Sequence, residues 1–353
     1  MRILFTFMAL ILLTACKKEQ LSGDASLFDV SVADLSRHSF TLDQIFLDEP
    51  GRTIYLLFAN RISPDSLPLQ FSTSFSLPVG ATSIPASGET VTLNSLDDRL
   101  KYTITAEDGT KVDYYVVVRD NQLPNSGFED WFTTTGMDGA SYKEPGKSAA
   151  TTVWATANYG TSIYGVYCTT PVVDGGNTEV QIKTGETSTV PVTAGTIFTG
   201  KFDINGAIDH PTDPRKATLF GIPFSLRPDS IKFRYKFQPG SHYIHATLKN
   251  PSNIFGGFTI SDIPGTDKFT AFAILEKRDG TDVLETGRAE IISSDSQDVM
   301  KEISLPFVYS SGEKPTHISV VFSSSKDGDV YTGAVGSILT IDDVELFYNP
   351  PGK

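Results

Sequence analysis

Apolar and polar residues alternate along many short segments of this chain. The clearest case is the segment 230–238, where basic residues alternate with Ile231, Phe233, Tyr235 and Phe237. Successive side chains of a β-strand point to opposite faces, so this pattern predicts a strand with one packed face and one solvent-facing face. No long segment shows the 3.6-residue period of an amphipathic helix, and 29 Gly and 20 Pro punctuate the short runs. The pattern therefore predicts an all-β fold.

The last apolar run changes phase within one predicted strand. Leu339 and Ile341 occupy alternate positions, and after Asp342-Asp343 the alternation continues at Val344 and Leu346 with the opposite parity. An extra residue in one strand of a sheet produces such a shift, so we expect a β-bulge at Asp342-Asp343. A second feature is a pair of strands, 269–275 and 284–292, which we expect to be joined by a turn over 276–282.

The chain is long enough for two domains, since its 353 residues exceed what one core usually serves. Residues 24–119 predict about seven short strands and end in a hairpin whose turn contains Asp108-Gly109. Residues 120–124 predict a linker, because Pro124 cannot donate to a sheet ladder and turn-forming residues follow it. Residues 125–349 predict a larger second β domain.

The N-terminus has the pattern of an export signal. An apolar run from Ile3 to Leu13 is too short to span a bilayer, which takes about twenty apolar residues. Small residues precede Cys16, as in a bacterial lipobox. We therefore expect residues 1–15 to be a lipoprotein signal peptide, Cys16 to carry the lipid, and residues 16–23 to form a tether. A lipid-anchored position at the outer membrane or cell surface follows, although the leaflet stays open.

Charge and cysteine content exclude several classes of partner and site. The net charge of −13, without a cluster of Lys and Arg, argues against nucleic acid and against an anionic membrane surface. Neutral or weakly charged glycans fit the overall charge better than acidic polysaccharides do. Cys168 is the one cysteine left once Cys16 is lipidated, so an intramolecular disulfide and a multi-cysteine zinc site are excluded.

The start of the second domain carries a resemblance to known proteins. The segment Asn125 to Trp131 is similar to the opening of many carbohydrate-binding jelly rolls. Further along the chain come Gly-Ile-Pro-Phe at 221–224, Arg-Pro at 227–228, and Gly-Ala-x-Gly-Ser at 333–337. In this order the pieces resemble the Putative carbohydrate metabolism domain (PCMD) of surface lipoproteins from Gram-negative glycan degraders. The resemblance implies a jelly-roll β-sandwich like that of carbohydrate-binding modules. The hairpin that ends the first domain resembles the Ig-like β-sandwich modules of the same lipoproteins, which act as spacers.

A calcium ion is implied by the same resemblance. In sugar-binding jelly rolls an early Glu and a late Asp-Asp-Val lie together, because the first and last strands are neighbours. Glu129 and Asp342 occupy these places here, so they are the predicted ligands of a structural calcium ion. The alternative is that both acids are solvated residues at strand ends.

Aromatic residues crowd the start of the second domain. Exposed Trp and Tyr rings stack on the C–H face of a sugar, and Asn bonds its hydroxyl groups. We therefore expect a glycan to contact Trp154, Asn158, Tyr159 and Tyr164. Ordinary packing in the core is the alternative for each ring.

No catalytic motif stands out, and sequence alone does not select a pair of carboxylates for glycoside hydrolysis. His242 and His245 are three residues apart in a predicted strand, on opposite faces, and so are not a metal pair. The predicted function is non-catalytic glycan binding at the cell surface in support of polysaccharide capture, alongside other surface glycan-utilisation proteins. A glycoside hydrolase and a structural or adhesive surface protein stay open as alternatives.

Overall fold

The computed structural model describes residues 21–33, 40–210 and 213–348. The predicted signal peptide (1–15) and the lipidated Cys16 lie outside these ranges, so both stay predictions. Within the described ranges, none of the helices has the length and apolar character needed to cross a membrane.

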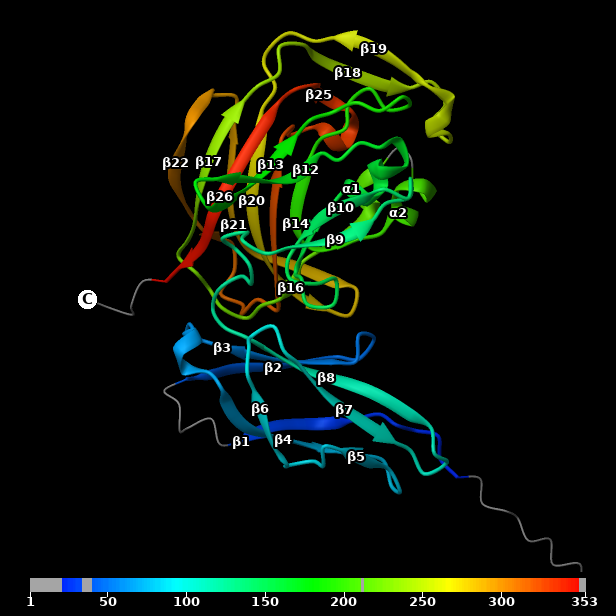
Figure 1. Ribbon diagram of the computed structural model, residues 1–353, viewed down its shortest axis with the longest axis vertical. Coiled ribbons are helices and arrows are strands. Elements are labelled where there is room, and N and C mark those ends of the chain that lie inside the picture. The colour runs from blue at the N-terminus through cyan, green and yellow to red at the C-terminus, as the bar shows by residue number, and fades with distance from the viewer. Residues whose placement is uncertain (1–20, 34–39, 211–212, 349–353) are drawn as a thin grey trace, which may run out of the picture.

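Strands make up nearly all the regular structure of the described residues, which confirms the all-β prediction. Two separate hydrophobic cores form. One comprises buried side chains from Ala25 to Val118, and the other comprises buried side chains from Leu123 to Leu346. Figure 1 shows the first domain, in blue to cyan, below the second, in green to red.

The first domain packs two sheets against each other. Their strand orders are β1–β4–β6 and β2–β3–β8–β7–β5, and β3 pairs with β8 in parallel. The strands are β1 (Phe28–Ala33), β2 (Leu42–Asp48), β3 (Thr53–Phe58), β4 (Leu69–Ser76), β5 (Thr82–Ile84), β6 (Thr90–Leu93), β7 (Arg99–Thr105) and β8 (Lys111–Arg119), with a short helix η2 (Pro64–Ser66). Phe75 of β4 meets Tyr102 of β7 edge-to-face at 5.4 Å between ring centroids. This domain is therefore a β-sandwich; its closer likeness to Ig modules stays a prediction.

The hairpin expected at the end of the first domain is present. β7 and β8 pair from Arg99↔Val117 to Thr105↔Lys111. Gly109 in the turn has φ +90°, a conformation that favours glycine. The Asp-Gly turn thus sets the register of this hairpin as the sequence indicates.

The second domain is a larger antiparallel sandwich. One sheet has the order β11–β14–β24–β20–β21–β23, with β15 and β16 attached, and the other has β12–β13–β26–β17–β22. Its main strands are β11 (Trp154–Thr156), β12 (Thr169–Asp174), β13 (Asn177–Lys183), β14 (Thr196–Phe202), β15 (Thr218–Phe220), β16 (Ile222–Pro223), β17 (Ser230–Gln238), β20 (Phe269–Asp279), β21 (Asp282–Ser293), β22 (Gln297–Pro306), β23 (Val308–Tyr309), β24 (His317–Ser323) and β26 (Ile338–Phe347).

Smaller elements surround this sandwich. They are the hairpin of β9 (Trp131–Thr135) and β10 (Ser141–Pro145), the sheet of β18 (Tyr243–Leu248), β19 (Phe258–Asp262) and β25 (Thr332–Ala334), and the short helices α1 (Asn158–Thr161), η3 (Ser162–Tyr164), α2 (Ile204–Asp209), η4 (Pro214–Ala217), η5 (Ile254–Gly256) and η6 (Gly328–Val330). Figure 1 shows β9, β10 and α1 together on one side of the second domain.

The alternating segment forms β17, an inner strand of the smaller sheet between β26 and β22. Along β17 every second residue, from Ile231 to Phe237, is buried, and the basic residues between them are partly exposed. Phe233 packs edge-to-face on Phe322 of the opposite sheet, at 5.1 Å between ring centroids. The prediction that this strand has one face packed in the core and one face toward solvent is confirmed.

The expected bulge in the last strand is also present. Opposite β17, the register of β26 shifts between the pairs Lys232↔Glu345 and Arg234↔Asp342. Asp343 adopts φ +49° at this point. The extra residue lets the apolar positions on both sides of the bulge face the core, which explains the phase change in the sequence.

The turn expected over 276–282 is wrong in extent. β20 and β21 continue pairing to Asp279↔Asp282, with a register shift next to Leu275. The charged residues of this segment belong to strands, where Glu276 pairs with His317 of β24. These positions lie at the partly exposed end of the sheet, where a strand needs no apolar side chain.

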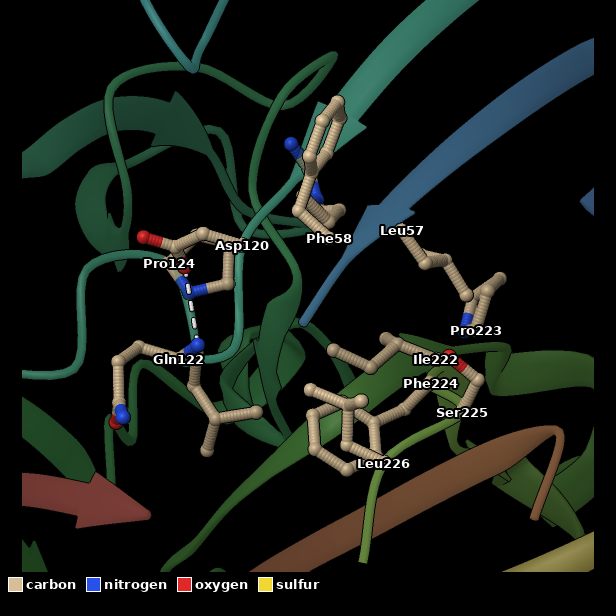
Figure 2. Close-up of a pocket in the computed structure, with 12 residues that line it drawn as sticks. Leu57, Phe58, Asp120, Gln122, Pro124, Ile222, Pro223, Phe224, Ser225 and Leu226 are labelled. Carbon is tan, nitrogen blue, oxygen red and sulfur yellow. Dashed lines mark hydrogen bonds between the residues drawn. The ribbon is translucent and has the colours of Figure 1, made fainter. Parts of the chain in front are cut away.

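The linker is bonded to the last strand of the second domain through a side chain. The Gln122 side chain donates from Nε2 to the Leu346 carbonyl at 2.8 Å and accepts the Leu346 N–H at 2.9 Å. Figure 2 shows the hollow beside it, lined by Leu57 and Phe58 of β3, the linker and the segment 222–226. Its volume of about 10 Å³ admits at most a water molecule. This part of the interface is packed and offers no room for a sugar.

Candidate functional site

A cluster of tyrosines and carboxyl groups forms where the β9–β10 hairpin meets the α1–η3 segment. The hairpin brings Tyr142 and Glu144 to one face of β10, since they are two residues apart in a strand. The turn of the hairpin contacts the helical segment through Met137 N–H, which donates to Ser162 Oγ at 2.8 Å. We call Tyr142, Tyr159, Tyr167, Glu144 and Asp138 the tyrosine site.

Two rings of the tyrosine site are stacked. Tyr142 and Tyr167 have centroids 5.0 Å apart and an interplanar angle of 24°. Tyr142 is buried, whereas Tyr167 is half-buried and its hydroxyl donates to the Asp138 carboxylate at 3.0 Å. The Tyr167 ring is therefore held on one face by the Tyr142 ring and at its hydroxyl by the Asp138 carboxylate. Tyr159 lies near enough to influence Tyr142 electrostatically, and 39% of it is exposed.

Glu144 is the carboxyl group with unusual electrostatics. Its Oε1 accepts from Thr156 Oγ1 at 2.7 Å, and the Tyr142 hydroxyl also bonds to it. Burial raises the pKa of Glu144 to about 7, and these two hydrogen bonds oppose the shift without cancelling it. Burial, together with the Glu144 charge, also raises the pKa of Tyr142. Near neutral pH this carboxyl exists in both protonation states, so it can donate or accept a hydrogen bond.

Two of the predicted glycan residues lie in the core. Trp154 is 1% exposed, stacks edge-to-face with Phe128 and donates from Nε1 to the Pro124 carbonyl at 2.8 Å. Asn158, also 1% exposed, bonds both groups of its amide to the backbone of Thr169. The expected exposure of the Trp154 ring was wrong, because its strand turns this side chain inward and the linker supplies its polar partner.

The other two predicted glycan residues are accessible. Tyr159 lies within the tyrosine site, whereas Tyr164 is half-buried at the end of η3. Of the two rings that lead the predicted set, Tyr159 is exposed and Trp154 is buried; glycan binding at any of these residues stays a prediction. The sequence did not select the other members of the tyrosine site, which are Tyr142, Tyr167, Glu144 and Asp138.

The predicted calcium ligands approach the same turn, between β12 and β13. Glu129 Oε1 accepts from Thr178 N–H at 3.2 Å, and Asp342 Oδ2 accepts from Asn177 Nδ2 at 2.7 Å. Asp342 is fully buried, which raises its pKa. These oxygens already serve amide donors, and the amide nitrogen of Asn177 is not a calcium ligand. This arrangement does not fit the ion as it stands; calcium binding at Glu129 and Asp342 stays a prediction.

Other chemistry-bearing residues are dispersed. Across the ranges that the structure describes, no group of three or more His, Cys, Asp or Glu residues is placed to hold a metal ion. His242 bonds to Asp262 and His245 to Thr332, so the two do not share a ligand. Cys168 is buried, and burial raises its thiol pKa to about 11, which makes the thiolate scarce at neutral pH.

Two solved structures with a similar fold come from Bacteroides species. One, described as a putative glycoside hydrolase from Bacteroides thetaiotaomicron VPI-5482, is 24% identical, with 95% of this chain and 99% of that chain covered and a TM-score of 0.54. Another, from Bacteroides vulgatus ATCC 8482 and described in the same words, is 24% identical, covers 63% of this chain and 97% of that chain, and has a TM-score of 0.51. At this identity the likeness shows the fold alone.

A more distant match is a family 11 carbohydrate-binding module from Clostridium thermocellum in complex with a mixed-linked tetrasaccharide. It is 12% identical over 62% of this chain and 95% of that chain, and its TM-score of 0.27 is too low to carry an argument. Comparison with proteins of curated function finds no match. The model of the family described as "Putative carbohydrate metabolism domain" matches residues 127–347, well over half of the sequence. The chain therefore belongs to the Putative carbohydrate metabolism domain family.

Proposed function

We propose that the second domain binds a glycan non-catalytically at the tyrosine site. The observation that carries this proposal is the fixed, half-buried Tyr167 ring, stacked on Tyr142 and held by Asp138, beside the exposed Tyr159. Membership of a carbohydrate-related family supports the class of ligand.

The chemistry of the site matches one face and one edge of a sugar ring. Tyr159 and Tyr167 offer apolar faces for the C–H groups, and a ring held in place loses little conformational freedom on binding. Asp138 lies at the hydroxyl edge of Tyr167, Glu144 is bonded to Tyr142 beneath it in the stack, and both carboxyl groups can bond sugar hydroxyls. Such contacts are individually weak, so binding strength would come from several sites acting together.

The cellular setting is part of the same proposal. A lipid on Cys16 would hold many copies on one membrane, and lateral clustering would supply avidity for a long polysaccharide. The first domain would act as a spacer. In this setting the protein would capture polysaccharide alongside other surface proteins that take part in glycan utilisation.

Removing the two accessible rings tests the proposal. Tyr159→Ala and Tyr167→Ala should each weaken binding to a recognised polysaccharide roughly two- to tenfold, since a stacked ring contributes about 0.5–1.5 kcal/mol. Affinity gel electrophoresis on a panel of neutral polysaccharides measures this. Tyr243→Ala, a partly exposed tyrosine on β18, is the matched control. Unchanged retention in both site variants would exclude the tyrosine site.

A glycoside hydrolase is the second candidate, favoured by Glu144. A carboxyl group with a pKa of about 7 is suited to protonate a leaving oxygen, provided that a second carboxylate faces it across the sugar. Under this alternative, Glu144→Gln would abolish release of reducing sugar from a polysaccharide that the native chain degrades. Absence of release from every bound polysaccharide favours binding without catalysis.

A further inference from the structure

A cleft of about 440 Å³ is lined by residues of both domains, so it belongs to neither domain alone. Its first wall comes from β2, β3, β7 and β8. Its second wall comes from the segment 149–153, β14, β15, β16 and residues of β20 and β24. The volume lies within the range of about 300–1,000 Å³ typical of small-molecule sites, which often occur between domains.

Positive charge collects in this cleft although the protein as a whole is acidic. Arg99, Arg119 and Lys201 line it, and in the part of the chain that the structure describes none of them forms an ion pair with a carboxylate. A fourth cation, Arg278, is shared with Glu276.

The acids of the cleft do not cancel this charge. Asp97 is paired with Lys147 at 2.6 Å, and Asp48 accepts the Gly51 N–H in its own turn. His317 adds no charge near neutral pH, because burial and the nearby Arg278 lower its pKa to about 4. The cleft thus carries an excess of cations over acids.

The arginines are held in place and keep spare donors. Arg99 crosses between the domains, where its Nη1 donates to the Ala150 carbonyl at 3.0 Å and its guanidinium lies 4.3 Å from the centre of the Tyr115 ring. Its buried Nε has no hydrogen-bond partner within the described structure. Arg119 Nη1 donates to the Leu96 carbonyl. A guanidinium has five N–H donors, so both residues can still bind an anionic oxygen.

Aromatic side chains complete the lining. Phe46, Tyr55 and Phe220 line the cleft, and Phe46 packs edge-to-face on His317 at 5.6 Å between ring centres. Hydroxyl groups of Thr53 and Thr151 lie among them. A site for a small inorganic anion needs no such apolar walls, whereas a sugar ring presents both an apolar face and hydroxyls.

We propose that this interdomain cleft binds an anionic saccharide, a sugar unit that carries a carboxylate or sulfate group. Arg99, Arg119 and Lys201 would hold the anionic group, and the aromatic side chains would contact the ring. This site is separate from the tyrosine site and does not depend on it. The net negative charge of the whole protein works against long polyanions, so the cleft favours a short oligosaccharide or a chain end.

Isothermal titration of the full chain with three probes tests the proposal: a galacturonic acid trisaccharide, its carboxyl-reduced neutral counterpart, and a sulfated galactose disaccharide. We expect at least one acidic probe to bind at least tenfold more tightly than the neutral one. Binding of the carboxylate or the sulfate probe alone would identify the anionic group. The proposal would be overturned if the neutral trisaccharide, or sodium sulfate without a sugar, bound as tightly as the acidic probes. It would also be overturned if neither acidic probe bound.

Variants assign the binding to the cleft. Arg99→Gln and Lys201→Gln should each weaken binding of the acidic probe about three- to tenfold, and Lys249→Gln, an exposed lysine after β18, should not. The Tyr159→Ala and Tyr167→Ala variants should bind the acidic probe normally. Lys201 is exposed, so its variant decides the outcome if Arg99→Gln fails to fold. Unchanged affinity in Lys201→Gln, or a loss confined to the tyrosine variants, would contradict the cleft.

Discussion

At the scale of single residues, the sequence identified aromatic chemistry but not its exposure. Trp154 and Tyr159 lie five positions apart in similar polar surroundings, yet one is buried and the other is on the surface. The difference depends on the Pro124 carbonyl and Phe128, which lie 30 and 26 positions earlier in the chain and reach Trp154 only in the folded structure. Periodicity within a strand of three residues is too short to reveal this.

Glu144 makes stability depend on pH at the same scale. Its folded pKa of about 7 lies above its ordinary value of 4.5, so the folded state binds the extra proton. The stability that protonated Glu144 contributes is fully present below about pH 4.5 and is lost as the pH rises through about 7. The loss amounts to at most about 3 kcal/mol.

We therefore predict that Glu144→Gln, which stays uncharged, loses less stability with rising pH than the native chain does. Urea unfolding at pH 5 and pH 8 measures it: the two proteins should differ little at pH 5, and the variant should be the more stable at pH 8. Parallel stability curves across this range would mean that Glu144 titrates normally.

At the scale of elements, the alternating strand β17 and the bulge of β26 were predictable, whereas the full length of β20 and β21 and the short hairpin β9–β10 were not. The alternation of β17 and the phase change of β26 are local patterns, so both could be predicted. The hairpin β9–β10 has five residues in each strand and a mostly half-exposed surface, which leaves little apolar signal. The one available hint was the spacing of Tyr142 and Glu144, which puts two polar-tipped side chains on one face of a strand.

The bulge of β26 yields a prediction about backbone conformation. Asp343 has φ +49°, which Asp tolerates and a β-branched residue does not. Asp343→Val should destabilise the fold by about 1–2 kcal/mol, whereas Asp343→Gly should be neutral or slightly stabilising. Chemical denaturation compares the two variants with the native chain. Equal stability of the Val and Gly variants would show that the left-handed conformation is not required.

At the scale of the whole molecule, the division into two β domains could be expected from length and turn residues, but the surface between them could not. Arg99 and Lys201 are 102 positions apart, and both line a cleft that only the packing of the domains creates. The net charge of −13 suggested neutral glycans as ligands. The cleft, in contrast, has an excess of positive charge, which the total does not reveal. The bonds from Gln122 to Leu346 hold the linker against the last strand and so help to fix this arrangement.

The most direct test of the central claim is a crystal structure of the chain with a neutral oligosaccharide taken from a polysaccharide that it retains in the gel. The account predicts a sugar ring stacked on Tyr159 or Tyr167, with its hydroxyls bonded to Asp138 or Glu144. A sugar bound elsewhere, with both tyrosine rings bare, would contradict it.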